Sequence, residues 1–356
     1  MIYYALAAIF PLLVNAYLYH KRTVTDIDEN QYEKSKKRML WLAVLPMILL
    51  YGLRYKRIGS DTIGYARFFE DEIRSYSFNE LFDSELMRFE TGFRLYARAI
   101  SWFFESYTMY FLVTAVLLFG ILVRFANKYT ENPFVFLYMF MTLGTYQFYE
   151  TGLRQALAMS ACLIAVDFVH NKKPFKFIIT VLIAATFHKS AYIFFILYPM
   201  ARIKNMYLKI TVNVVAGGVS LVGFTVFQEW FNKLLGYEYE IEETGNGQIF
   251  AILVTLISLF SLFVLFREKS EKSGQDVIVQ MTFLTVIFWL LRLISRTAER
   301  ISFYFTFGMY IYFSQTFKND KDKSALAIKL LFLGAFFALF MMRNINASYK
   351  FFWQGV

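Results

Sequence analysis

Cysteine and histidine are scarce in this sequence of 356 residues, which contains one cysteine, Cys162, and three histidines. One cysteine excludes a disulfide within the chain and a cysteine metal cluster. Three histidines leave little material for a histidine metal site, and no group of His, Asp and Glu with ligand spacing accompanies them. We therefore expect neither a bound metal nor a cofactor.

A soluble domain is also lacking. Hydrophobic residues make up 58% of the chain and the mean hydropathy is +0.43, which excludes an ordinary soluble globular protein. Apolar runs of roughly 14–20 residues, close to the length that crosses a bilayer, recur about a dozen times. We predict one all-α polytopic integral-membrane domain over 1–356, with about 12 transmembrane helices. The predicted spans are 2–19, 39–53, 107–126, 133–149, 152–170, 174–187, 190–201, 209–228, 248–266, 277–295, 301–317 and 325–342.

Three of these runs, 39–53, 174–187 and 190–201, are short, which indicates broken, tilted or re-entrant helices. The first run lacks a basic stretch before it and a small-residue cleavage site, so we expect it to be a retained span rather than a signal peptide.

The net charge of +10 is compatible with nucleic-acid binding, but the distribution of the charges argues against it. If the spans alternate in direction, one set of short loops is basic, and the positive-inside rule places that set in the cytoplasm. Both termini then lie outside, and no nucleic-acid partner is expected. The basic residues of these loops are Lys21, Arg22, Lys34, Lys36, Lys37, Arg38, Lys172, Lys173, Lys176, Arg202, Lys204, Lys209, Arg267, Lys269, Lys272, Lys318, Lys321 and Lys323.

Two long segments fall on the outer face. In 54–106, Ser60 or Asp61 can cap a short helix that starts at Thr62. Residues 93–106 of the same segment form an amphipathic pattern, with Arg94, Arg98, Ser101 and Glu105 on one face, as in a helix that lies in the membrane interface. The second segment, 229–247, contains the acidic run EYEIEETGNG and is predicted to be a loop.

Charged residues also gather at the outer ends of the spans. YETGLRQALA at 149–158 places Glu150 and Arg154 one helical turn apart between two spans. On one helix, Arg292, Arg296 and Arg300 would fall within about 80° of one another. Two interpretations remain open: structural ion pairs that hold helical hairpins, or a cationic cavity for an anion such as a phosphate or diphosphate, which arginine binds well. The remaining members of this set are Arg54, Arg57, Asp61, Glu90, His188, Lys189 and Glu299.

Five motifs occur in a characteristic order: RIGSDTIGY at 57–65, FETGF at 89–93, ETGLRQALA at 150–158, FHKSA at 187–191 and SRTAERISFY at 295–304. Together they resemble the EpsG-type family of bacterial exopolysaccharide polymerases, which are Wzy-like proteins. The resemblance extends over nearly the whole chain. Ser60 stands where the usual family motif has threonine, and the C-terminal tail NINASYKFFWQGV matches poorly.

The resemblance implies a GT-C-like glycosyltransferase in the bacterial cytoplasmic membrane, with its active site on the outer face. A polyprenyl-diphosphate-linked oligosaccharide would donate its glycan to the terminal sugar of a second lipid-linked unit. Membrane lipid, and chain-length regulator and flippase proteins of the same pathway, are the other implied partners. A flippase of lipid-linked oligosaccharide and a glycan ligase remain alternatives.

The candidate site residues follow from these motifs. A general base must remove the proton of the acceptor hydroxyl, and the candidates are Asp61, Glu150 and His188, of which His188 is favoured narrowly. Arginine and lysine side chains can stabilise charge on the diphosphate leaving group without a metal. The candidate diphosphate-binding residues are Arg57, Arg154, Lys189, Arg292, Arg296 and Arg300, and the candidate substrate-binding residues are Tyr65, Glu90, Gln155 and Tyr304.

Overall fold

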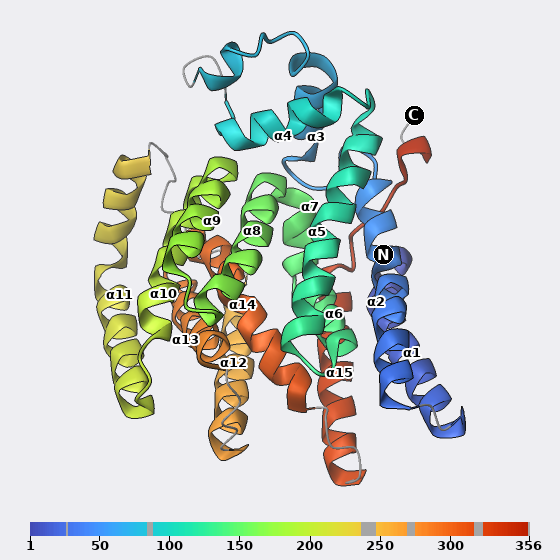
Figure 1. The fold of residues 1–356 in the computed structure, drawn as a ribbon, viewed down its shortest axis with the longest axis vertical. Helices are drawn as coiled ribbons and strands as arrows, with labels where there is room; N and C mark the ends of the chain where they lie inside the picture. Colours follow the sequence, from blue (N-terminus) through green and yellow to red (C-terminus); the bar gives the residue numbers. More distant parts are fainter. Residues whose placement is uncertain (26–27, 84–87, 236–246, 269–274, 317–322, 355–356) are drawn as a thin grey trace. The chain divides into compact units, whose positions relative to one another are not determined.

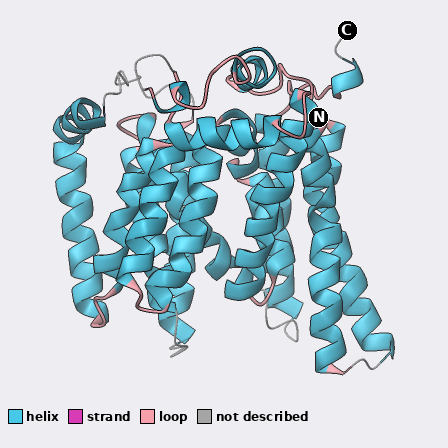
Figure 2. Ribbon diagram, turned by 45° about the horizontal axis from the view of Figure 1, so that its top comes forward, coloured by secondary structure: helices cyan, strands magenta, loops and turns pink. Residues whose placement is uncertain are grey.

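The chain is almost entirely helical in the computed structural model, which describes residues 1–25, 28–83, 88–235, 247–268, 275–316 and 323–354. Helix follows helix along most of the described chain (Figures 1 and 2). Over these described ranges the β-structure consists of an isolated bridge between Arg54 and Phe351. The α-helices are α1 (Ile2–Thr25), α2 (Glu29–Gly52), α3 (Thr62–Arg67), α4 (Thr91–Ser101), α5 (Tyr107–Tyr129), α6 (Pro133–Thr142), α7 (Thr145–Thr151), α8 (Leu153–His170), α9 (Pro174–Phe187), α10 (Leu197–Ala201), α11 (Met206–Leu235), α12 (Gln248–Glu268), α13 (Gln275–Leu291), α14 (Thr297–Gln315) and α15 (Lys323–Arg343).

Each predicted span coincides with helical structure, which confirms the all-helical class. In the described part of the chain, four helices are long and apolar enough to cross a bilayer: Ile2–Val24, Tyr107–Tyr129, Leu153–His170 and Met206–Phe224. The prediction of one continuous span at 133–149 is wrong, because α6 ends at Thr142 and α7 starts at Thr145. The short run 190–201 is broken, as expected, into the 3₁₀ helix η3 (Lys189–Ile196) and α10.

Local sequence signals explain where several helices begin. Asp28 accepts a hydrogen bond from the backbone N–H of Gln31 at the start of α2, and Ser106 does the same for Met109 at the start of α5. Asn132 caps α6 through the N–H of Val135, and Pro133 follows at the first helical position. These caps mark where the helices begin within the polar stretches that separate the apolar runs.

The described chain divides into two compact units. Unit 1 comprises residues 1–160, 186–188 and 317–356, and unit 2 comprises residues 161–185 and 189–316. In unit 1, α2 packs against α1 and α5, while α6 packs against α1, α5 and α15. Figure 1 shows α1 and α2 side by side as a hairpin.

Unit 2 is built around the α13–α14 hairpin, against which α12 packs. A Cβ atom at Gly308 of α14 would lie 2.9 Å from the carbonyl oxygen of Ile278, so glycine permits the close approach of the two helices. A buried amide pair, Asn213 with Gln280, joins α11 to α13 at 2.8 Å.

The outer segment 54–106 contains the two predicted helices, with differences in detail. α3 starts at Thr62, but the Asp61 side chain makes no capping hydrogen bond. α4 runs across the direction of α5 in Figure 1, as an interfacial helix would, but ends at Ser101, so Glu105 lies beyond it.

The face of α4 that was expected to be polar is partly buried. Arg94 is buried and donates to the carbonyl oxygen of Asp83 at 2.6 Å, while Arg98 donates to that of Ile73 at 2.9 Å. These arginines therefore bind backbone carbonyls of the preceding loop. Of the predicted loop 229–247, residues up to Leu235 belong to α11, which corrects its start, and 236–246 lie outside the described residues.

Candidate functional site

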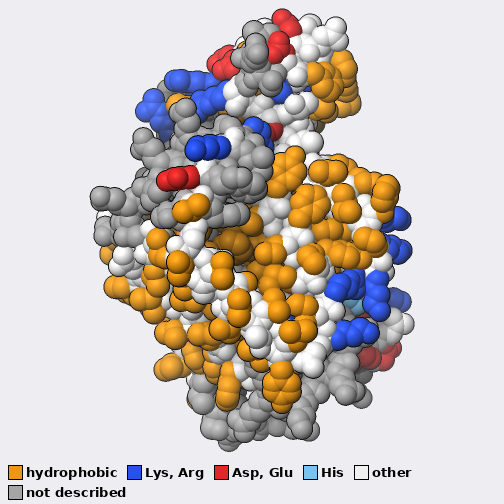
Figure 3. Space-filling model, turned by 90° about the vertical axis from the view of Figure 1, so that its left-hand side faces the viewer, with side chains coloured by type: hydrophobic (Ala, Val, Ile, Leu, Met, Phe, Trp, Pro, Cys, Tyr) orange, Lys and Arg blue, Asp and Glu red, His pale blue; other side chains and the backbone are white. Residues whose placement is uncertain are grey.

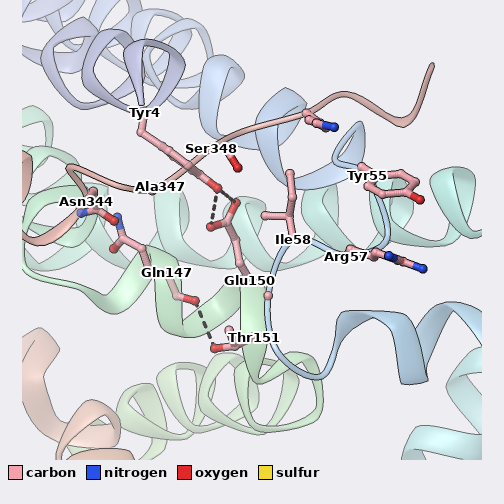
Figure 4. A pocket seen from close by; sticks show the side chains of 12 residues that line it. Tyr4, Tyr55, Arg57, Ile58, Gln147, Glu150, Thr151, Asn344, Ala347 and Ser348 are labelled. Carbon is pink, nitrogen blue, oxygen red and sulfur yellow. Dashed lines mark hydrogen bonds between the residues drawn. The ribbon is translucent and has the colours of Figure 1, made fainter. Parts of the chain in front are cut away.

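A cavity of about 640 Å³ lies in unit 1, at the ends of several helices. Its lining comes from α1, the loop after α2, α7 and the segment after α15, so it joins the first and last parts of the chain. Figure 4 shows these side chains around Glu150. The lining residues are Tyr4, Tyr55, Arg57, Ile58, Gly59, Gln147, Glu150, Thr151, Asn344, Ala347, Ser348 and Lys350.

Glu150 is the carboxylate of this cavity. It is 4% exposed, and its two carboxylate oxygens accept from the Tyr4 hydroxyl at 3.1 and 3.0 Å (Figure 4). Among the described residues, no lysine or arginine forms an ion pair with it. Burial raises the pKa of Glu150 to about 7, although Arg54 and the Tyr4 hydrogen bond act in the opposite direction. A carboxyl group with this pKa can exchange protons near neutral pH.

The backbone of Glu150 is fixed by the loop that follows α2. Because α7 ends at Thr151, the Glu150 carbonyl has no helical partner, and it accepts from Arg54 at 3.2 Å and from Thr62 at 3.1 Å. Arg54 is fully buried, with its guanidinium 3.8 Å from the centre of the Tyr51 ring.

Gly59 permits the close contact between this loop and α7. Its φ is +96°, and a Cβ atom there would lie 2.8 Å from the Glu150 carbonyl oxygen. Gly59 therefore makes a tight turn that lets the loop pack on the backbone of Glu150.

The C-terminal tail forms one wall of the cavity through backbone contacts. Tyr55 donates its N–H to the carbonyl of Lys350, and Phe352 donates to that of Leu53, each at 2.9 Å. The amino group of Met1 donates to the carbonyl of Ala347, also at 2.9 Å. The tail therefore lies between the start of the chain and the end of α2.

The balance of charge and polarity in the cavity favours an anionic, hydroxyl-rich ligand. Arg57 and Lys350 are two cations against the single carboxyl group of Glu150. The Gln147 side chain is also in the lining, and neither end of its amide has a hydrogen-bond partner among the described residues. A buried amide without partners is rare in folded proteins, and an amide both donates to and accepts from sugar hydroxyls.

Arg154 does not pair with Glu150, so that interpretation of YETGLRQALA is wrong. Gly152 interrupts the helix between the two residues, and Arg154 instead forms an ion pair with Glu90 and lies over the Phe89 ring at 4.9 Å. Glu90 precedes α4 in the long outer segment. The ion pair therefore connects that segment to α8.

The remaining candidates of unit 1 lie outside the cavity lining. Asp61 is exposed, whereas His188, at the end of α9, is 5% exposed. Gln155 is buried in α8, and Tyr65 is buried beside Phe89 and Phe93. Burial raises the pKa of Tyr65, against the lowering effect of Arg154. The roles predicted for these residues stay predictions.

In unit 2 the three candidate arginines do not share one helix, which corrects the stripe predicted from their spacing. α13 ends at Leu291 and α14 starts at Thr297, with Arg296 at its N-cap. Arg292 is buried, and its Nε donates to Glu299 at 2.6 Å. This ion pair agrees with the structural interpretation of Glu299.

The other unit 2 candidates differ in burial. Arg300 is exposed and Lys189 is half-buried, so a ligand-binding role for either stays a prediction. Tyr304 is buried, and its hydroxyl lies 2.9 Å from the Ser190 hydroxyl.

Several residues of the cavity were not predicted from the sequence. Tyr4 lies in an apolar run, Gln147 within a predicted span, and Asn344, Ser348 and Lys350 in a tail without helical periodicity. A glutamine near the end of an apolar run was an available signal, since intramembrane polar groups are costly. The tail offered no comparable signal.

Comparison with known proteins supports the resemblance. Neither the curated proteins nor the solved structures contain a significant match to the chain. The sequence model of the EpsG family matches residues 37–354, which includes most of the tail that had seemed a poor match and begins after α1. Because this match covers most of the sequence, the chain belongs to the EpsG family.

Proposed function

We propose that this protein is a polymerase of lipid-linked oligosaccharide repeat units at the outer face of the bacterial cytoplasmic membrane. Its donor is a polyprenyl-diphosphate-linked glycan, and its acceptor is the terminal sugar of a second lipid-linked unit. Membership of the EpsG family suggests a polysaccharide polymerase, and the apolar helices agree with an integral membrane protein. The twelve-span, GT-C-like architecture forms part of this proposal.

The observation that carries the proposal is the group of chemical functions in the unit 1 cavity. A carboxyl group with a pKa near 7, two cations and a buried amide without partners line one space of about 640 Å³. Cavities of this size bind small molecules, and these groups match the parts of a glycosyl diphosphate. Five motif residues belong to the same lining: Arg57, Ile58, Gly59, Glu150 and Thr151.

The proposed step uses Glu150 as general base. The acceptor hydroxyl transfers its proton to Glu150, and its oxygen forms a bond to the anomeric carbon of the donor. The bond from that carbon to the diphosphate oxygen breaks, and the electron pair leaves with the diphosphate. Arg57 and Lys350 stabilise the charge that develops on this leaving group. Tyr4 orients the Glu150 carboxylate, and Gln147 binds sugar hydroxyls.

The proposal is tested with purified protein and synthetic polyprenyl-diphosphate-linked repeat units. A ladder of chain lengths is expected. One transfer to a foreign acceptor would indicate a ligase instead, and movement of the glycan across the bilayer without a new bond would indicate a flippase. Either result would overturn the polymerase assignment.

Matched variants locate the chemistry. Glu150→Gln keeps the shape of the side chain and loses the base, so the ladder should disappear, while His188→Gln and Asp61→Asn should retain it. For the leaving-group role, Lys350→Gln is compared with Lys56→Gln, a neighbouring lysine that does not line the cavity. Equal effects of the two lysine variants would remove Lys350 from the mechanism.

A further inference from the structure

A second cavity, of about 340 Å³, lies within unit 2. Its lining comes from the end of α8, the end of α10 with the residues that follow, and the first turn of α13. Among the lining residues are four basic side chains, His170, Lys172, Arg202 and Lys204, and one acidic side chain, Asp276.

The acidic side chain is already neutralised. Asp276 Oδ1 lies 3.0 Å from the Nζ atom of Lys209, and the Lys209 side chain is fully buried. Because the charge of Lys209 already balances that of Asp276, this carboxylate does not offset the other cations of the lining. Lys172, Arg202 and Lys204 therefore give the cavity a positive charge that no acidic side chain of its lining offsets.

The Arg202 guanidinium is fixed in orientation by two contacts. One guanidinium nitrogen donates to the carbonyl oxygen of Val169 at 2.7 Å, and the guanidinium lies 4.5 Å from the centre of the Tyr198 ring. These contacts fix the plane of the group and leave further N–H donors for an anion, an arrangement suited to phosphate oxygens. Arg202 thus differs from a solvent-exposed lysine whose only role is to orient the protein in the membrane by the positive-inside rule.

Lys172 also departs from what local geometry favours. Its backbone φ is +56°, a positive value that non-glycine residues rarely adopt. Lys172 also follows the end of α8, a position where glycine is the usual residue. Within the described residues, neither Lys172 nor Lys204 forms an ion pair. A lysine at this position supplies a cation to the cavity where a glycine would suit the backbone better.

Apolar surface continues from the cavity. Tyr198, in the lining, packs against Phe177 of α9 at 5.2 Å between ring centres. The outward side of α9 exposes Phe175, Ile178 and Leu182. Figure 3 shows lysine and arginine side chains at the edge of a largely hydrophobic surface. A ligand with an anionic head and an apolar tail matches this combination.

We propose that this cavity binds the phosphodiester head group of an anionic phospholipid, with the acyl chains along the exposed side of α9. With the basic loops in the cytoplasm, the lipid belongs to the inner leaflet, where basic pockets between helices bind anionic head groups. The site is independent of the proposed glycosyl transfer, since none of its residues lines the unit 1 cavity.

The test compares two double variants of the full chain. Lys172→Gly with Lys204→Gln removes two cations of the cavity, and the glycine suits the positive φ, so folding should be unaffected. Lys173→Gln with Lys176→Gln removes the same charge from neighbouring exposed lysines that do not line the cavity. Each protein is reconstituted in nanodiscs of phosphatidylcholine that contain a minor fraction of phosphatidylglycerol as the probe. Each lysine near an anionic membrane surface contributes about fivefold in affinity. Retained phosphatidylglycerol is then counted by native mass spectrometry.

We expect wild type and the control variant to retain phosphatidylglycerol over phosphatidylcholine, and the cavity variant to bind phosphatidylglycerol about 25-fold more weakly, since two lysines are removed. Equal loss in both variants would mean general attraction to a basic surface and would overturn the proposal. Competition by soluble glycerol phosphate, without preference for phosphatidylglycerol, would assign the site to a soluble phosphate and would also overturn it. Failure of polymerase activity would leave this measurement unaffected.

Discussion

Glu150→Gln should change how the stability of the protein depends on pH. Burial raises the pKa of Glu150 from 4.5 to about 7 in the folded protein. The folded state therefore holds the proton more tightly than the unfolded state across this interval, and folding stability falls as the pH rises through it. The loss is absent below about pH 4.5 and complete above about pH 7.

The magnitude follows from the shift in pKa. At 1.36 kcal/mol per pKa unit, a shift of this size corresponds to about 3 kcal/mol of unfolding free energy. With the entropy of unfolding typical of globular proteins, that is about 4 °C in Tm for a chain of this length. Glutamine does not ionise and can accept one hydrogen bond from Tyr4, so the variant should lack this component.

The assay is thermal unfolding in detergent at several pH values between 5 and 8, for wild type and Glu150→Gln together. Because all other titrating groups are common to both proteins, the difference between their Tm values isolates Glu150. The wild type should lose about 3 °C relative to the variant between pH 5 and pH 8, since part of the loss already occurs below pH 5. Parallel Tm curves would refute the reasoning, since Glu150 would then titrate alike in the folded and unfolded states.

Three other changes separate ligand contacts from structural ones. Gln147→Met removes a buried amide that has no partner among the described residues, so Tm should be unchanged or higher. The loss of about two hydrogen bonds to a sugar should reduce polymer formation roughly tenfold or more. A lower Tm with normal polymer formation would contradict the assignment. Arg154→Ala removes the partner of the Glu90 carboxylate, so the unfolding free energy should fall by about 3–5 kcal/mol, with partial recovery in Arg154→Lys. A stable Arg154→Lys variant with activity reduced about a hundredfold would instead indicate that Arg154 binds the diphosphate of the donor. For topology, a cysteine at Asn346 should react with an impermeant thiol reagent in intact cells and one at Asn171 should not, with the buried Cys162 as background; the reverse pattern would place the cavity on the cytoplasmic side.

The helices could be predicted because their signals are local. Apolar runs of sufficient length must form helices in a membrane, and Asp28, Ser106 and Asn132 mark where three of them begin. The tight turn at Gly59 could be predicted for the same reason, since a glycine beside polar residues already indicates special backbone geometry. The break between α6 and α7 was missed because Leu143 and Gly144 continue an otherwise apolar run.

The pairing of charges could not be predicted because it is a tertiary property. Spacing suggested Glu150 with Arg154, yet Arg154 pairs with Glu90, which is 64 residues away, and Glu150 bonds to Tyr4, 146 residues away. A single non-helical residue, Gly152, is enough to turn the two side chains out of register. Backbone hydrogen bonds join the tail to residues 53–55, and such bonds leave no mark in the side-chain pattern.

The presence of charged residues therefore does not distinguish the candidate site from structural ion pairs. Whether the buried polar groups have hydrogen-bond or ion-pair partners does distinguish them. The Arg154–Glu90 and Arg292–Glu299 pairs match each cation with a carboxylate, which suits a structural role. In the unit 1 cavity, by contrast, Glu150 is buried without an ion pair and Gln147 is buried without a hydrogen bond among the described residues. Both features cost folding free energy. For Glu150 this cost is complete above its pKa, which is also the pH range in which the ionised carboxylate can act as a base. A polar ligand with hydroxyl groups would relieve the cost at Gln147, so the same cavity that weakens the fold is the place where binding has most to gain.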